Sequence, residues 1–257
     1  MAGPTLPEPV ADVARELTAL PGAVAVVLGG SRATDAHRPD SDWDLGLYYR
    51  ASEGAFEAGG LRRLGHEGYV SELGEWGPIV NGGAWLTIED TPVDVIFRDL
   101  DTVERWLEDA RDGQFEVLSQ NGYVVGAPTY LPVGELAICQ PISGDLPHPG
   151  FPDALAESAP PQWLGRASVA LMFAQIHATA GDTVACTGML AEAALCTAHA
   201  RLAERREWAL NEKRLIHRAG LDAVQPLLAS PGSTSADLTH TVTAVSTALD
   251  VTPLTAR

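Results

Sequence analysis

The spacing of apolar residues over the first hundred positions predicts a small sheet with helices. Val10, Val13, Ala14 and Leu17 recur at helical spacing, which predicts an amphipathic helix that ends before Pro21-Gly22. Short apolar runs bounded by Gly, Pro, Asp and Ser are typical of strands. The predicted strand segments are residues 23–28, 42–49, 68–70, 79–80, 85–88 and 93–97, the last two paired through a turn at residues 89–92.

Farther along the chain the pattern becomes helical. Residues 102–111 form one predicted helix, and six prolines between residues 141 and 161 argue against regular helix or central strand there. We therefore expect an N-terminal domain at residues 1–145, a Pro-rich linker at 146–161 and a helical domain at 162–257. The expected helices of that domain are residues 163–179, 183–208 behind an N-cap at Asp182, 210–219, and a last one marked by Leu238, Val242, Val245 and Leu249.

These elements predict an α/β (α+β) fold. A small mixed sheet with helices on one side is followed by a C-terminal α-helical bundle, and we expect the active site between the two. Trp43 and Trp85 are expected to pack against the sheet.

Composition narrows the class of protein. The chain has 257 residues, 46% of them hydrophobic, with no apolar run long enough for a membrane span and no secretory signal at Met1. Three scattered cysteines, without metal-site spacing, predict small core residues in a reduced, cytoplasmic protein. A net charge of −17 disfavours a nucleic-acid partner and would attract a small cationic one.

The most informative motif is Gly29-Gly30-Ser31, followed after ten residues by Asp42-Trp43-Asp44. Residues two apart on a strand point to the same face, so Asp42 and Asp44 are expected to project together. A glycine turn lets backbone N–H groups approach a phosphate, and Mg²⁺ binds one or two carboxylates together with phosphate oxygens. The motif therefore predicts a site for a metal-bound polyphosphate.

A third acid is expected from a neighbouring strand. Asp94 is the single charge in the apolar run of residues 91–97, on the face opposite to Val93 and Val95. Three carboxylates can hold two metal ions, an arrangement that stabilises both the attacking and the leaving oxygen of an in-line phosphoryl displacement. The alternative is that these acids are solvated residues on a polar strand face.

The combination of Gly-Ser, a spacer of roughly ten residues, Asp-x-Asp and a later Asp, over residues 23–97, resembles the DNA polymerase β-like nucleotidyltransferase superfamily. The resemblance implies that Gly30 and Ser31 bind the triphosphate, and that Asp42, Asp44 and Asp94 bind two Mg²⁺ ions. It implies transfer of a nucleoside monophosphate from a nucleoside triphosphate, with ATP the expected one, to an acceptor hydroxyl. Arg32 could touch a phosphate, or be a surface arginine.

The two-part layout, length and acidity resemble those of aminoglycoside nucleotidyltransferases, which implies a small-molecule acceptor such as an aminoglycoside-like antibiotic or a metabolite. Relatives of that kind bind their nucleotide through a base of the helical domain and activate the acceptor through a carboxylate there. Lys213, the only lysine, and Glu192, flanked by apolar residues, are the candidates. Lys213 could instead be a solvated helix charge, and Glu192 a partner for an arginine.

Two other functions remain open at this stage. One is a nucleotidyltransferase acting on tRNA or on a protein hydroxyl, which a basic face would favour. The other is a non-catalytic nucleotide-binding regulator, against which the presence of all three acids argues.

Overall fold

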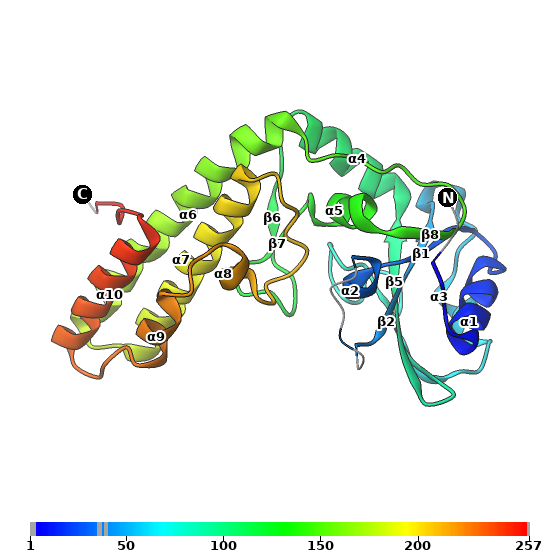
Figure 1. Cartoon of the computed structure of the whole chain (residues 1–257), viewed down its shortest axis with the longest axis horizontal. Helices are drawn as coiled ribbons and strands as arrows, with labels where there is room; N and C mark the ends of the chain where they lie inside the picture. Colours follow the sequence, from blue (N-terminus) through cyan, green and yellow to red (C-terminus); the bar gives the residue numbers. More distant parts are fainter. Residues whose placement is uncertain (1–3, 35–37, 39–40, 256–257) are drawn as a thin grey trace. The chain divides into compact units, whose positions relative to one another are not determined.

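A computed structural model describes residues 4–34, 38 and 41–255 of the chain (Figure 1). The chain divides into two compact units. The first contains residues 1–110, 115–121 and 126–150, and the second contains residues 111–114, 122–125 and 151–257. Unit 1 holds the sheet and unit 2 is helical, which confirms the predicted fold class.

Unit 1 is built around a mixed six-stranded sheet with the order β3-β4-β5-β2-β1-β8. β2 and β5 run parallel at its centre, and every other neighbouring pair is antiparallel. The strands are β1 (Ala23–Leu28), β2 (Trp43–Tyr49), β3 (Glu67–Val70), β4 (Gly83–Ile88), β5 (Thr91–Asp99) and β8 (Gln140–Ser143), with a separate small pair of β6 (Val117–Leu118) and β7 (Ala127–Pro128). The predicted hairpin of β4 and β5 is confirmed, and its tip residues Glu89 and Asp90 both have positive φ.

Helices cover both faces of this sheet, so the expectation of helices on one side was wrong. One face packs Leu45, Val93 and Val95 against α1 (Glu8–Thr18) and α3 (Ala58–Arg62). The other face packs Val27 and Tyr48 against α4 (Leu100–Arg111) and α5 (Leu131–Ile138). Alternation along each strand supplies apolar residues to both layers. The remaining short helices of unit 1 are α2 (Gly30–Ala33) and the 3₁₀ turn η1 (Ala51–Glu53).

Unit 2 is helical, and its three long helices α6, α7 and α10 pack along one another. Its elements are α6 (Asp153–Ala180), α7 (Thr183–Glu204), α8 (Leu215–Arg218), α9 (Val224–Ala229) and α10 (Ser235–Leu249). α7 begins at its predicted cap, where the Asp182 carboxylate accepts a hydrogen bond from the Ala185 N–H at 3.1 Å. α10 agrees with the predicted last helix.

The Pro-rich segment differs from its prediction. α6 begins at Asp153 and continues through Pro160 and Pro161, so the second half of the expected linker at 146–161 is helical. The buried side chains of Leu155, Ala159 and Trp163 lie on one face of these turns, and their burial outweighs the backbone bonds that the prolines cannot donate. The helix predicted over 210–219 is only α8, four residues long.

The three cysteines are buried and unpaired, as predicted. Burial raises the pKa of the Cys196 thiol to about 12. In the part of the chain that the structure describes, no helix is apolar over enough turns to span a bilayer.

Candidate active site

The two central strands bring two of the predicted acids side by side. β2 and β5 are parallel, and Asp44 is the register partner of Asp94. Neighbouring strands lie about 4.8 Å apart, and register partners project from the same face. Both acids are half-buried, whereas Leu45, Val93 and Val95 on the opposite face are fully buried. Because these two acids are 50 residues apart in the sequence, only the pairing of β2 with β5 brings them together.

The glycine turn lies directly against one of these acids. Gly29 donates its N–H to the Asp44 carbonyl at 2.8 Å, which continues the pairing of β1 with β2 into the turn. Gly30 has φ +58°, and a Cβ built on it would lie 1.8 Å from Asp44 Oδ2. Only glycine fits here, for the backbone angle and for the space. The glycine turn and the Asp44 carboxylate therefore lie in direct contact.

Asp42 and Ser31 lie at the edge of this arrangement. Asp42 precedes β2 and is exposed, and Ser31 is half-buried in the first turn of α2. Within the described ranges, no group of three or more His, Cys, Asp or Glu side chains is arranged to hold a metal ion. The structure thus brings together Gly30, Asp44 and Asp94. The roles of Asp42 and Ser31 in the site stay a prediction.

Arg32 braces the segment that carries Asp42. Its guanidinium donates to the carbonyl of Ser41 at 2.6 Å and to the carbonyl of Asp42 at 3.1 Å. The same group lies 4.0 Å over the ring of Trp43. A planar fork with several donors suits this geometry, which a lysine could not reproduce. Arg32 thereby fixes the approach of the chain to β2.

An aromatic cluster that the sequence did not suggest as a site extends the row of acids. Trp85 on β4 is the register partner of Asp94, and Tyr69 on β3 is the register partner of Trp85. Trp85 is 55% exposed, so the expectation that it packs against the sheet was wrong. The signal was present in the alternation of β4, where Ala84, Leu86 and Ile88 are buried and Trp85 faces the other way.

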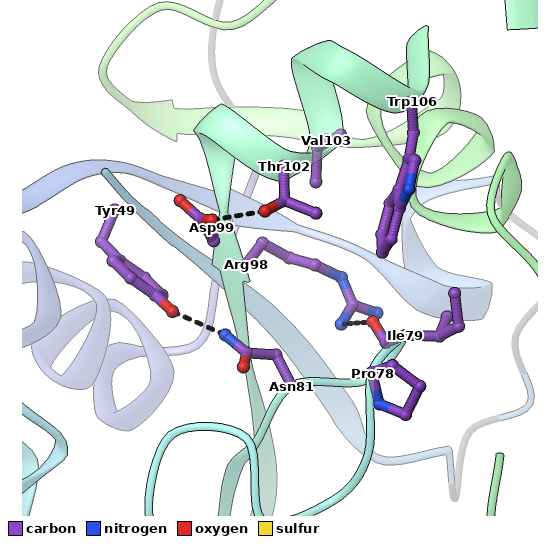
Figure 2. Close-up of a pocket in the computed structure, with 9 residues that line it drawn as sticks. All are labelled: Tyr49, Pro78, Ile79, Asn81, Arg98, Asp99, Thr102, Val103 and Trp106. Atoms are coloured by element: carbon purple, nitrogen blue, oxygen red, sulfur yellow. Dashed lines mark hydrogen bonds between the residues drawn. The ribbon is translucent and has the colours of Figure 1, made fainter. Parts of the chain in front are cut away.

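A pocket of unit 1 lies away from these acids. It has a volume of about 100 Å³ and is lined by residues of β2, β5, α4 and the loop before β4, including Tyr49, Arg98 and Trp106 (Figure 2). Arg98 is buried and forms a two-pronged ion pair with Glu135, at 2.6 and 2.7 Å. It lies four residues past Asp94, about 13 Å along the strand. We regard the pocket as a structural feature, since its buried charge is already paired.

The helical unit holds the two remaining predicted residues. Glu192 on α7 is 29% exposed, and its carboxylate lies 3.9 Å from the guanidinium of Arg166. This contact agrees with the alternative prediction that Glu192 is a partner for an arginine. Lys213 is exposed in the loop before α8, where its N–H bonds to the Asn211 side chain at 2.9 Å. Neither observation tests a catalytic role.

A buried histidine, His199, lies on α7 about two helical turns beyond Glu192. The ring of His199 stacks on Trp163 at 4.4 Å, and no hydrogen bond to either ring nitrogen is found within the described structure. Burial, together with the charges of Arg166 and Arg218, lowers the pKa of His199 to about 4. This histidine is therefore neutral at physiological pH.

Comparison with known proteins agrees with the geometry of unit 1. Residues 10–102 match the family model of the nucleotidyltransferase domain. This segment is a nucleotidyltransferase domain. The matched segment includes Gly30, Asp44 and Asp94, and it supports a nucleotidyltransferase enzyme.

Other comparisons add little to this assignment. A nucleotidyltransferase-like protein from Exiguobacterium sibiricum 255-15 is 11% identical, with a TM-score of 0.47 over 95% of this chain and 74% of that one. An aminoglycoside 6-adenyltransferase from Bacillus subtilis is 10% identical, with a TM-score of 0.27 over 95% of this chain and 90% of that one. Both TM-scores are below 0.5 and support no argument. Among curated proteins, no sequence matches the chain.

Proposed function

We propose that this nucleotidyltransferase moves a nucleoside monophosphate from a nucleoside triphosphate, ATP by preference, to a hydroxyl group of a small molecule. The observation that carries the proposal is the register of Asp44 with Asp94, together with the Gly30 turn that lies on the Asp44 carboxylate. The acceptor oxygen would form a bond to the α-phosphorus, and the bond to the β-phosphate oxygen would break. Pyrophosphate leaves, and the hydroxyl proton passes to a protein carboxylate.

The residues at this site fit magnesium. Carboxylate oxygens are the ligands that Mg²⁺ prefers, and it commonly binds one or two of them plus substrate phosphates. Asp44 and Asp94 supply such a pair from adjacent strands, and Asp42 is the proposed third ligand. Bound Mg²⁺ would neutralise charge on the triphosphate, which lowers the barrier to phosphoryl transfer. Two ions are proposed, on the strength of the three acids.

The other proposed roles follow from position and charge. The backbone of Gly30 and the hydroxyl of Ser31 would donate hydrogen bonds to the triphosphate. Lys213 is exposed and would stabilise the charge that builds on the pyrophosphate. Glu192, which is partly accessible, would accept the proton of the acceptor hydroxyl.

The acceptor is proposed to be small and cationic, such as an aminoglycoside-like antibiotic or a metabolite. The net charge of −17 attracts cations and repels the phosphates of nucleic acid. Such a reaction takes place in the cytoplasm, where nucleoside triphosphates are present.

A pyrophosphate-release screen tests the function. Each common triphosphate would be combined with Mg²⁺ and with aminoglycosides, nucleosides or tRNA. Asp44→Asn and Asp94→Asn should lower turnover by about three orders of magnitude or more, because the metal ligands are lost. Asp90→Asn, at the exposed tip of the same hairpin, is the matched control and should keep full activity.

Calorimetric measurement of Mn²⁺-ATP binding distinguishes an enzyme from a protein that only binds the nucleotide. The two active-site variants should weaken this binding, while the control should not. Wild-type protein that binds Mn²⁺-ATP but releases no pyrophosphate with any acceptor would be a regulator. Equal activity of Asp94→Asn and wild type would remove Asp94 from the site.

A further inference from the structure

We propose that Tyr69, Trp76 and Trp85 form the acceptor-binding surface of this enzyme, a platform on which a hydroxylated ring carrying ammonium groups stacks. We call these three side chains the aromatic platform. The proposal rests on the proposed function, because it takes Asp44 and Asp94 as the place of phosphoryl transfer. Its own evidence is the position, the rigidity and the exposure of the three aromatic residues, together with the charge of the acids beside them.

The aromatic platform continues the row of acids across one face of the sheet. Asp44 pairs in register with Asp94, Asp94 with Trp85, and Trp85 with Tyr69. Because strands lie about 4.8 Å apart, Trp85 begins one strand spacing from Asp94 and Tyr69 two. The Gly30 turn lies at the other end of this row, against Asp44.

This order separates the two sides of the reaction. In an in-line displacement, the attacking oxygen and the leaving group lie on opposite sides of the phosphorus. With the pyrophosphate on the Gly30 side of the acids, the acceptor hydroxyl approaches from the side of β4 and β3. The aromatic platform is the surface that this approach meets first.

The three rings are held in place by one another and by buried hydrogen bonds. Trp76 stacks on Trp85 with ring centroids 4.7 Å apart, and Tyr69 lies 5.7 Å from Trp85. The buried amide of Gln120 accepts from the N–H of Ile79 and donates to the Trp76 carbonyl, which fixes the loop that carries Trp76. Gly83 leaves room for the Trp76 ring, since a Cβ there would lie 2.7 Å from it.

Despite this support, the aromatic platform is open. Trp85 is 55% exposed and Tyr69 is 42% exposed. Scattered exposed apolar residues are common, but a stacked group beside catalytic acids is a contiguous patch and marks a binding surface. Rigid aromatic rings bind a ligand ring at small cost in conformational entropy.

The charge around the aromatic platform selects a cation. The Tyr69 hydroxyl donates to the Glu75 carboxylate, and this bond lowers the pKa of Glu75, which keeps it ionised. Asp94 lies on the other side of Trp85. Arg62, which also lies near Glu75, is already in an ion pair with Glu72 at 2.6 Å. Aromatic faces attract cations, and carboxylates at both ends strengthen the effect.

Calorimetric titration of the full-length protein tests the proposal. The probes are kanamycin A, streptomycin and spectinomycin, with maltotriose as an uncharged hydroxylated control. Trp85→Ala should weaken binding of the cationic probe by about five- to thirtyfold, and Trp85→Phe by less than about threefold, because an aromatic face remains. Phe173→Ala on α6, which removes an aromatic of similar exposure (43%), should bind like the wild type.

Each other outcome overturns the proposal. Failure of all three cationic probes to bind wild type, or equal binding of maltotriose, would exclude a cationic ring as the occupant. Weaker binding of Mn²⁺-ATP by Trp85→Ala, with unchanged binding of the cationic probes, would assign the aromatic platform to the nucleobase. A wild-type protein that does not bind Mn²⁺-ATP would instead refute the proposed function. Failure of the acceptor-surface proposal and failure of the proposed function are therefore distinguishable. Thermal unfolding checks that Trp85→Ala is folded, and Trp85→Phe keeps the test informative if it is not.

Discussion

Replacing Gly30 by alanine should disable the site through a single steric contact. The new Cβ would lie 1.8 Å from Asp44 Oδ2 and 2.5 Å from its Cγ, whereas ordinary contacts begin at 3.4 Å. The Asp44 carboxylate must therefore move by roughly 1.5 Å, which is large against the narrow tolerance of Mg²⁺ coordination. Misplacement of about 1 Å costs on the order of a hundredfold in rate, so we expect kcat to fall by at least about that factor.

A matched control separates this contact from backbone strain. Gly54 has φ +63°, close to the +58° of Gly30, and its Cβ would have nothing within 4 Å. Each alanine should cost about 1–2 kcal/mol for the left-handed conformation. Melting temperatures should thus fall by a few degrees in both variants, at roughly 2–4 °C per kcal/mol. Only Gly30→Ala should lose activity.

The assay is pyrophosphate release with the best acceptor from the screen, together with calorimetry of Mn²⁺-ATP. Gly54→Ala should match the wild type in both measurements. A Gly30→Ala protein that melts like Gly54→Ala and keeps kcat and Mn²⁺-ATP affinity within about threefold would refute the reasoning, because the Asp44 carboxylate would then not need its observed position.

Three further changes test other contacts. If the guanidinium fork holds the segment of Asp42, Arg32→Lys should lower kcat about as much as Arg32→Ala. A kcat of Arg32→Lys close to that of the wild type in steady-state kinetics would show that only the charge matters. Lys213→Ala should lower kcat/KM by about a hundredfold with an unchanged melting temperature, and Arg105→Ala, an exposed base on α4, should change neither. The pKa of His199 is about 4 in the folded protein, below its value of about 6.5 in the unfolded chain. The free energy of unfolding therefore contains a part of about 3 kcal/mol that is complete above pH 6.5 and is lost as pH falls toward 4. Thermal unfolding of His199→Phe across this range should show a shallower loss, and parallel curves would contradict the shifted pKa.

The sequence alone predicted most of the elements, because their signals are local. Helical spacing in Val10 to Leu17, the cap at Asp182 and the alternation around Val93 act within a few residues. The order of Gly30, Asp44 and Asp94 also indicated the class of enzyme. Local signals failed where burial overrode them, as in α6, which continues through Pro160 and Pro161 because Leu155, Ala159 and Trp163 are buried along this helix.

Only the tertiary structure decided which residues share the site. Strand pairing is non-local, and a shift of one residue in register would turn every side chain of a strand to the other face. The register of β2 with β5 joins Asp44 to Asp94, and that of β5 with β4 adds Trp85, which sequence assigned to the core. The contact of Gly30 with Asp44 likewise depends on how β1 meets β2. The composition of each strand is written locally, while the neighbours of each side chain follow from the packing of the whole sheet.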